Sequence, residues 1–182
     1  MSKINMGCGA NKIPGYINID PEEGCNPDLV FNMLDGPLPY EDNSQEEIVF
    51  FHCIEHVQKY CHKLILQEFY RVLQPGGKLY ISYPNFKECA LNWINNKDAN
   101  RKFWEATIYG LQRFETDFHV SLMDPDELSE LLLLVGFDNI IHTPEPAEPF
   151  NMITFAKKSS RPAICHEQVI KEECERLSIE IQ

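Results

Sequence analysis

Short runs of apolar residues alternate along the chain with segments in which apolar residues recur every three or four positions. The short runs are typical of buried strands, and the longer-period segments are typical of helices that pack one face on a sheet. We expect strands at residues 3–6, 16–19, 29–33, 48–51, 78–83, 140–142 and 152–156. We expect helices at residues 58–73 and 126–135, which end before Pro75-Gly76-Gly77 and at Gly136. This alternation predicts an α/β fold with a mainly parallel sheet.

The connection between the first two predicted strands is unusually short. No crossover helix fits between Gly9 and Tyr16, although parallel neighbours usually need a dozen or more connecting residues. Either the first crossover helix is reduced to a turn, or the second strand is placed irregularly.

Length and composition predict one folded domain with an appended tail. The chain has 182 residues, of which 43% are hydrophobic and 11% aromatic, enough for a core and against disorder as the main state. We assign residues 1–158 to the domain, with an aromatic-rich helical cap at about 86–118. The large residues of this cap pack a small core of their own, form a lid that excludes water from the acceptor site, or do both. Residues 159–182 are predicted to form an accessory helical tail that packs on the domain or joins a second copy in a homo-oligomer.

The charge of the chain narrows the possible partners. The formal net charge is −12 and no basic patch is visible, which disfavours nucleic acid and anionic membranes. The longest apolar run is residues 131–135, far below the roughly 20 residues of a membrane span. Without a secretory signal at the N-terminus, the sequence predicts a cytoplasmic protein.

The seven cysteines form no CxxC pair, which is typical of small buried thiols in a reducing compartment. One group contains residue types that bind zinc: His52, Cys53, His56, Cys61 and His62. Its spacing matches no zinc template, so we predict no metal site there.

Three features lie at predicted strand ends, where α/β sheets hold ligands. Gly7-Cys8-Gly9 lets the backbone approach a ligand closely, but Lys12 stands where a dinucleotide fingerprint needs glycine. Asp20 can accept both hydroxyls of a ribose, or form a turn before Pro21. Asp35 can accept a hydrogen bond from an adenine amino group, with Leu34 or Leu38 packing on the ring.

Taken in order, the segments resemble the class I S-adenosylmethionine-dependent methyltransferases, within the type 11-like subgroup that carries GCG and LxPGG motifs. The resemblance covers about residues 3–157. Its segments are Asn5-Met6-Gly7-Cys8-Gly9, residues 14–20, Asp35, Ile54-Glu55-His56, residues 68–77 and Gly136-Phe137. The resemblance implies a Rossmann-like, mainly parallel sheet with an antiparallel C-terminal hairpin, and S-adenosylmethionine as the cofactor.

The resemblance also implies roles for single residues. The loop with Asn5, Gly7, Cys8 and Gly9 would border the methionine part of the cofactor. Asp20 would hold the ribose, Leu34 and Asp35 the adenine, and His52 would lie near the sulfonium. The chain departs from the family pattern at Asn5, where an acidic residue is usual, and at Asn11, where a third glycine is usual.

An activated methyl group needs mainly a nucleophile placed in line, and a base when that nucleophile carries a proton. His52, His56 and His119 are the candidate bases, and we assign catalysis to His119 and His56. Alternatively, His119 is a loop residue bonded to Asp117, and His56 only orders its loop with Glu55.

The predicted activity is methyl transfer to an oxygen or nitrogen of a small molecule or sugar. The alternative is a non-catalytic module that keeps the fold for interaction or regulation. A nicotinamide-dependent oxidoreductase is disfavoured by Lys12 and by the missing first helix.

Overall fold

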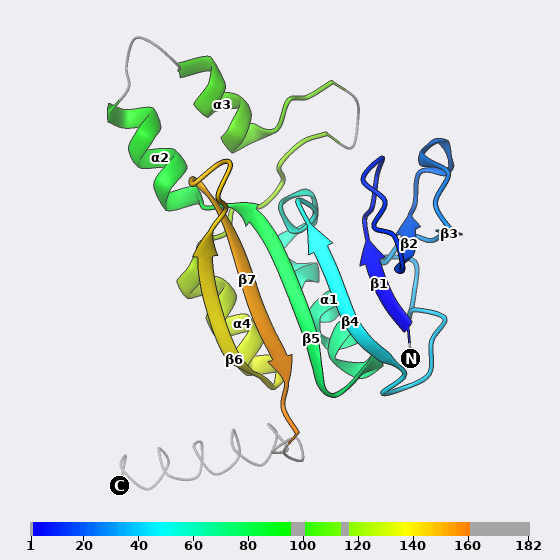
Figure 1. The fold of residues 1–182 in the computed structure, drawn as a ribbon. Coiled ribbons are helices and arrows are strands. Elements are labelled where there is room, and N and C mark those ends of the chain that lie inside the picture. Colours follow the sequence, from blue (N-terminus) through cyan, green and yellow to red (C-terminus); the bar gives the residue numbers. More distant parts are fainter. Residues whose placement is uncertain (1, 96–100, 114–116, 161–182) are drawn as a thin grey trace, which may run out of the picture.

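One seven-stranded sheet runs through the computed structural model, which describes residues 2–95, 101–113 and 117–160. Its strand order is β3-β2-β1-β4-β5-β7-β6 (Figure 1). Strands β1 to β5 are parallel to one another, and β7 pairs antiparallel with both β5 and β6. The bounds are β1 Ser2–Met6, β2 Ile17–Asp20, β3 Leu29–Val30, β4 Gln45–Phe51, β5 Leu73–Pro84, β6 Phe137–Pro144 and β7 Asn151–Lys158. The predicted parallel sheet with an antiparallel C-terminal hairpin is confirmed.

All seven predicted strands are present, but some bounds were wrong. The third strand was expected to reach residue 33, yet β3 stops at Val30. The side chain of Asn32 ends it, because its Oδ1 accepts from the Leu34 amide at 3.0 Å and turns the chain. Conversely, β5 begins at Leu73 rather than at residue 78, since Leu73 already pairs with Gln45 of β4.

Helices α1 (Lys59–Val72) and α4 (Pro125–Val135) lie on the same face of the sheet (Figure 1). Helix α4 begins where its sequence predicts, because Asp124 Oδ1 accepts from the Glu127 amide at 2.9 Å. It ends at Gly136, whose φ of +112° is the left-handed conformation of a C-terminal cap. Among the described residues, no helix is long and apolar enough to cross a membrane.

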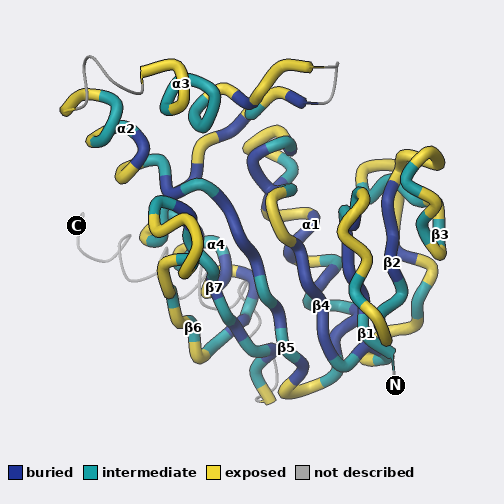
Figure 2. Tube along the Cα trace, turned by 45° about the horizontal axis from the view of Figure 1, so that its top comes forward, coloured by how far each residue is buried: buried dark blue, intermediate teal, exposed yellow. Residues whose placement is uncertain are grey.

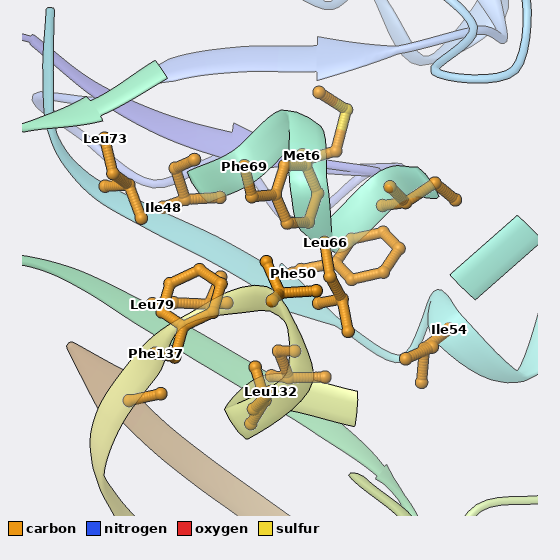
Figure 3. Close-up of a cluster of buried hydrophobic side chains, with 14 of the residues drawn as sticks. Met6, Ile48, Phe50, Ile54, Leu66, Phe69, Leu73, Leu79, Leu132 and Phe137 are labelled. Carbon is orange, nitrogen blue, oxygen red and sulfur yellow. The ribbon is translucent and has the colours of Figure 1, made fainter. Parts of the chain in front are cut away.

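The hydrophobic core fills the space between the sheet and these two helices (Figure 3). The rings of Phe50 on β4 and Phe69 on α1 meet edge to face at 5.2 Å. Leu132 brings α4 to the same core and is fully buried. Central strands are therefore buried, while the outer loops are exposed (Figure 2).

Two asparagine side chains support the connection from β1 to β2, which contains no helix. Strands β1 and β2 pair in regular register from Ile4 and Ile17 onward, so the helix is reduced and the second strand is not misplaced. Asn5 Nδ2 donates to the Asn11 carbonyl at 3.0 Å and to Asn18 Oδ1 at 2.9 Å. Asn18 Oδ1 also accepts from the Ile13 amide at 2.8 Å. Buried amides thus hold a loop that a helix would otherwise stabilise.

Helices α2 (Phe86–Asn95) and α3 (Arg101–Tyr109) lie beyond the carboxyl end of β5 (Figure 1). They fall within the predicted cap at 86–118. Phe103 and Trp104 of α3 form edge-to-face contacts with Phe150 of the β6–β7 loop, at 5.5 and 5.1 Å between ring centroids. Phe114 of the predicted cap and residues 161–182 of the predicted tail lie outside the described residues.

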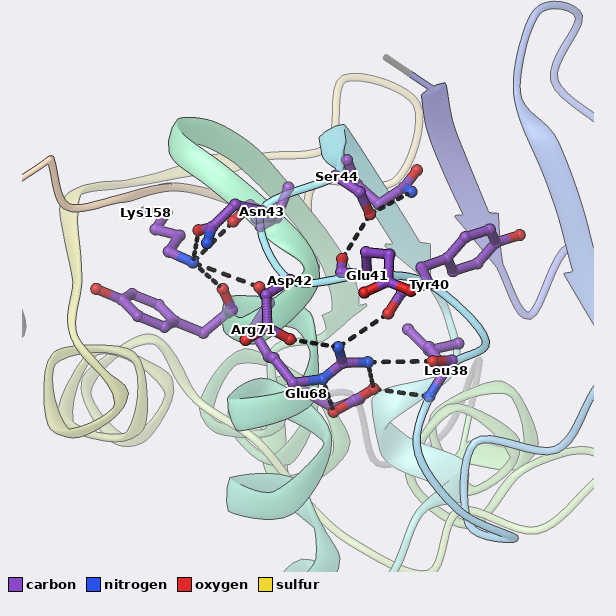
Figure 4. A network of polar contacts seen from close by, with 12 residues as sticks. Leu38, Tyr40, Glu41, Asp42, Asn43, Ser44, Glu68, Arg71 and Lys158 are labelled. Atoms are coloured by element: carbon purple, nitrogen blue, oxygen red, sulfur yellow. Dashed lines mark hydrogen bonds and ion pairs between the residues drawn. The ribbon is translucent and has the colours of Figure 1, made fainter.

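The opposite end of the sheet carries a polar network centred on the C-terminus of α1 (Figure 4). Lys158 Nζ donates to the carbonyls of Tyr70 at 2.6 Å and Leu73 at 2.8 Å, and to Asn43 Oδ1 at 2.8 Å. A cation at this position satisfies carbonyls that the helix leaves unpaired and complements its dipole. Lys158 thereby fastens the last strand to α1.

Candidate active site

The loop after β1 needs glycine at two positions. Gly7 has φ +67°, and a Cβ there would lie 2.3 Å from Cys53 Sγ, so both conformation and space exclude a side chain. Gly9 has φ +48°, and a Cβ there would meet no atom within 4 Å. Cys8 between them is buried, and burial raises the pKa of its thiol. The loop therefore presents backbone and open space at the carboxyl edge.

Asp20 at the end of β2 ties that loop to the next turn. Its Oδ2 accepts from the Gly9 amide at 2.7 Å, and its Oδ1 accepts from the Glu22 amide at 2.9 Å. The turn predicted from Asp-Pro is therefore present, together with a bond to the glycine loop. Each carboxylate oxygen can accept more than one hydrogen bond, so these contacts leave acceptor capacity.

The remaining residues predicted to bind the cofactor differ in how far they are buried. Asn5 is buried beneath the glycine loop, and its Nδ2 donates only within the protein. Leu34 and Asp35 lie exposed on the turn that follows β3. Because the Phe31 amide donates to the Asp20 carbonyl at 3.1 Å, this turn lies on the same edge as Asp20.

His52 ends β4 in the left-handed conformation, with φ +51°. Its Nδ1 lies 3.4 Å from Glu55 Oε1 and its Nε2 lies 3.6 Å from Glu145 Oε2. These carboxylates, Glu55 foremost, raise the pKa of His52 despite the opposing effect of burial.

A cavity of about 260 Å³ lies between the end of β4, helix α3 and the β6–β7 loop. Its lining brings together the three histidines that the sequence proposed as bases. It is lined by His52, Glu55, His56, Pro84, Phe103, Ala106, Thr107, Gly110, Leu111, Asp117, His119, Glu148, Phe150 and Asn151. A larger, open depression of about 910 Å³ near Leu38 and Arg71 has no histidine in its lining.

His56, His119 and Glu55 converge on this cavity. The two imidazole rings meet edge to face, with centroids 4.9 Å apart. His56 Nδ1 lies 2.9 Å from the Phe118 carbonyl, which can only accept, so Nδ1 carries the proton and Nε2 is left free. Glu55 is 4% exposed, and its Oε2 has no hydrogen-bond partner among the described residues.

Burial lowers the pKa of His119, which favours a neutral imidazole at neutral pH. The alternative of a His119–Asp117 hydrogen bond is not observed among the described residues, where the Asp117 carboxylate accepts from Arg113. Arg113 Nε donates to Asp117 Oδ2 at 2.8 Å, and the guanidinium lowers the pKa of Asp117 to about 2.

A family model of the methyltransferase domain matches residues 16–142. The chain belongs to this methyltransferase family. The match confirms the predicted enzyme class and S-adenosylmethionine as the cofactor of this methyltransferase. No curated protein matches the chain significantly.

Solved structures share the fold of this methyltransferase at low sequence identity. An S-adenosylmethionine-dependent methyltransferase from Archaeoglobus fulgidus is 14% identical with a TM-score of 0.64, and 86% of each chain is covered. One from Methanosarcina mazei is 20% identical with a TM-score of 0.61, covering 88% of this chain and 93% of that one. The 1,6-didemethyltoxoflavin-N1-methyltransferase of Burkholderia thailandensis, solved with S-adenosylhomocysteine, is 12% identical with a TM-score of 0.54, covering 87% and 71%.

The sequence did not predict that the buried Glu55 side chain lines the candidate active site. Glu55 was considered only as a loop partner of His56, because the sequence gives no sign that its side chain is buried. The five residues weighed as a zinc site do not converge: His62 Nε2 lies 3.1 Å from the Ile54 carbonyl and 3.0 Å from that of Val57, while Cys53 faces Gly7.

Proposed function

We propose that S-adenosylmethionine binds along the carboxyl edge of β1, β2 and β3. The open space at Gly9 and the adjacent Asp20 carboxylate support a methionine part near the glycine loop and a ribose near Asp20. Leu34 and Asp35 are exposed on the next turn, within the same edge, and would take the adenine. Asn5 would support the glycine loop without touching the cofactor. Cys8 would contact the cofactor through its backbone. When bound, this cofactor supplies an electrophilic methyl group.

The acceptor, in this proposal, is an oxygen or nitrogen nucleophile of a small molecule or sugar that enters the cavity beside His52. A volume of about 260 Å³ suits a small group. Glu55, Asp117 and Glu148 contribute carboxylates to its lining, which contains no lysine or arginine among the residues that the structure describes. This charge favours a neutral or cationic acceptor over an anionic one.

His119 is proposed as the base, with His56 as its neighbour in the site. The observation that carries this proposal is the convergence of His119, His56 and Glu55 in one cavity. A neutral His119 can take the proton of an acceptor hydroxyl or ammonium on its free nitrogen. Phe103 and Phe150, which line the cavity from the cap and the β6–β7 loop, would exclude water.

The alternative function is a non-catalytic interaction module with a closed acceptor site. The cavity beside the cofactor edge supports the enzyme over this alternative. We further propose a cytoplasmic location, no nucleic-acid partner, and dispensability of residues 159–182 for cofactor binding. Homo-oligomerisation through that tail is tested by comparing the mass in solution of the full chain and of a chain truncated after Lys158.

The proposed function is tested with methyl-labelled S-adenosylmethionine and fractionated small-molecule extracts. We expect transfer of label to a neutral or cationic compound, and a fall of at least about 100-fold in kcat for His119→Ala, a range typical of a lost base. Binding of S-adenosylhomocysteine by this variant should stay unchanged. An equal rate for wild type and His119→Ala would refute the assignment of the base.

A further inference from the structure

The carboxylate of Glu55 lacks a partner that its burial demands. Glu55 is 4% exposed, and its Oε2 accepts no hydrogen bond from the described residues. Its other oxygen, Oε1, lies 3.4 Å from His52 Nδ1. A buried polar oxygen without a hydrogen-bond partner is costly, so such an atom marks a position where a ligand or ion belongs.

Two imidazoles lie close to the Glu55 carboxylate. One ligand atom from each of Glu55, His56 and His119 can be chosen so that all three lie within 4.8 Å of one another. Donor atoms that share one ion at about 2.0–2.2 Å are about 3–4 Å apart, so side-chain rotations alone would bring these three together. The groups come from the turn after β4 and from the segment before α4.

One of the two histidines has an outer contact that is usual for metal ligands. His56 Nδ1 donates to the Phe118 carbonyl at 2.9 Å, which leaves Nε2 as the unprotonated nitrogen. His119 lines the same cavity beside Thr107. Metal-binding histidines commonly donate their second ring nitrogen to a backbone carbonyl, which fixes the tautomer and the ring orientation.

We propose that Glu55, His56 and His119 form a binding site for one divalent first-row transition-metal ion. Two imidazoles and one carboxylate suit zinc, cobalt or iron, and three protein ligands leave positions open toward the cavity. Only His56 is shared with the five residues among which the sequence predicted no metal site; Glu55 and His119 complete the set. Asp117 is not a ligand, because Arg113 binds its carboxylate.

The site itself is independent of the proposed function, but the role of the ion rests on it. An ion in this position would bind the acceptor oxygen or nitrogen at an open position and lower the pKa of its proton. In the metal-bound enzyme the ion would replace His119 as the group that prepares the nucleophile. The proton would leave to solvent.

The experiment is a titration of the untagged, chelator-treated full chain with CoCl₂, followed by absorption, and with ZnCl₂, followed by calorimetry and thermal unfolding. We expect one ion per chain, a visible cobalt spectrum without a thiolate charge-transfer band, and an upward shift of the unfolding temperature with zinc. Glu55→Gln and His119→Ala should bind more than about 100-fold more weakly, because losing even an outer contact costs 10–100-fold.

Glu148→Gln is the matched control, a carboxylate that lines the same cavity outside the three ligands. It should keep the stoichiometry and the spectrum of the wild type. Absence of binding, a thiolate band, or equal affinity in Glu55→Gln would overturn the site. Full methyl transfer by the metal-free enzyme would overturn the role of the ion and leave the proposed function intact. Failure of the wild-type chain to bind S-adenosylhomocysteine would overturn the proposed function and leave the metal site intact.

Discussion

Replacing Asp20 by alanine separates the two roles that this carboxylate has at the end of β2. Its two oxygens accept from the Gly9 amide at 2.7 Å and the Glu22 amide at 2.9 Å. The first bond shapes the glycine loop, and the second closes the turn. If the side chain also holds the ribose, the variant loses a ligand contact in addition to these two.

The two losses have different sizes. Glu22 is exposed, so water replaces its bond, whereas the partly buried Gly9 amide loses a charge-assisted bond worth about 1.5–3 kcal/mol. We expect the free energy of unfolding to fall by about that amount. Ribose hydroxyls left without their acceptor would cost a further 1–3 kcal/mol in binding, roughly a 5–150-fold rise in Kd.

The assay is calorimetry with S-adenosylhomocysteine, together with urea unfolding of the same samples. Asp28→Asn is the control, because Asp28 supports the same loop through Asn18 but lies away from Gly9. Asp35→Ala should weaken binding less than Asp20→Ala, since water can satisfy an adenine amino group. A folded Asp20→Ala protein with unchanged Kd would show that the carboxylate serves only the turn and the loop.

Three further predictions concern stability. Lys158→Met should lower the free energy of unfolding by about 2–3 kcal/mol, because carbonyls at the end of α1 lose their donor. Urea unfolding measures this loss, and an unchanged midpoint would contradict it. His52 has a raised pKa, so its stabilising contribution is full below its unfolded pKa of about 6.5 and is lost as pH rises through the folded pKa. The stability difference between wild type and His52→Gln should therefore be larger at pH 5.5 than at pH 8.5, and a difference independent of pH would refute the pairing with Glu55. Gly7→Ala should lower the free energy of unfolding by about 1–3 kcal/mol, because the new Cβ strains the backbone and collides with Cys53. Adding Cys53→Ala should restore part of this loss. No restoration would mean that backbone strain alone is responsible.

The positions of the strands and the edge with the cofactor residues could be predicted because both follow from local sequence. Apolar runs locate buried strands, and the carboxyl ends of parallel strands meet at one edge, which puts Gly7, Asp20 and His52 at neighbouring strand ends. The short β3 was not predictable from apolar residues, because the Asn32 side chain decides where the strand stops.

The acceptor side could be predicted only in part. His119 was a candidate from its place before a helix, but its neighbours depend on contacts between distant segments. Arg113 forms a hydrogen-bonded ion pair with Asp117. The Val120 and Ser121 amides both donate to the Glu55 carbonyl, at 2.9 and 3.2 Å. The pattern of apolar and polar residues does not predict such contacts between distant segments. The proximity of Glu55 to His119 could therefore be seen only in the folded structure.

The turn after β4 joins the two halves of the site. Cys53 packs against Gly7 of the cofactor loop, whereas Glu55 contacts His52 through its side chain and the segment with His119 through its carbonyl. His52 enters this turn with φ +51°, so the position of each half depends on the same few backbone angles. A movement of this turn therefore shifts the glycine loop and the acceptor cavity together. Changes at Cys53 should for this reason alter cofactor affinity and acceptor KM in parallel, although its side chain packs against the cofactor loop.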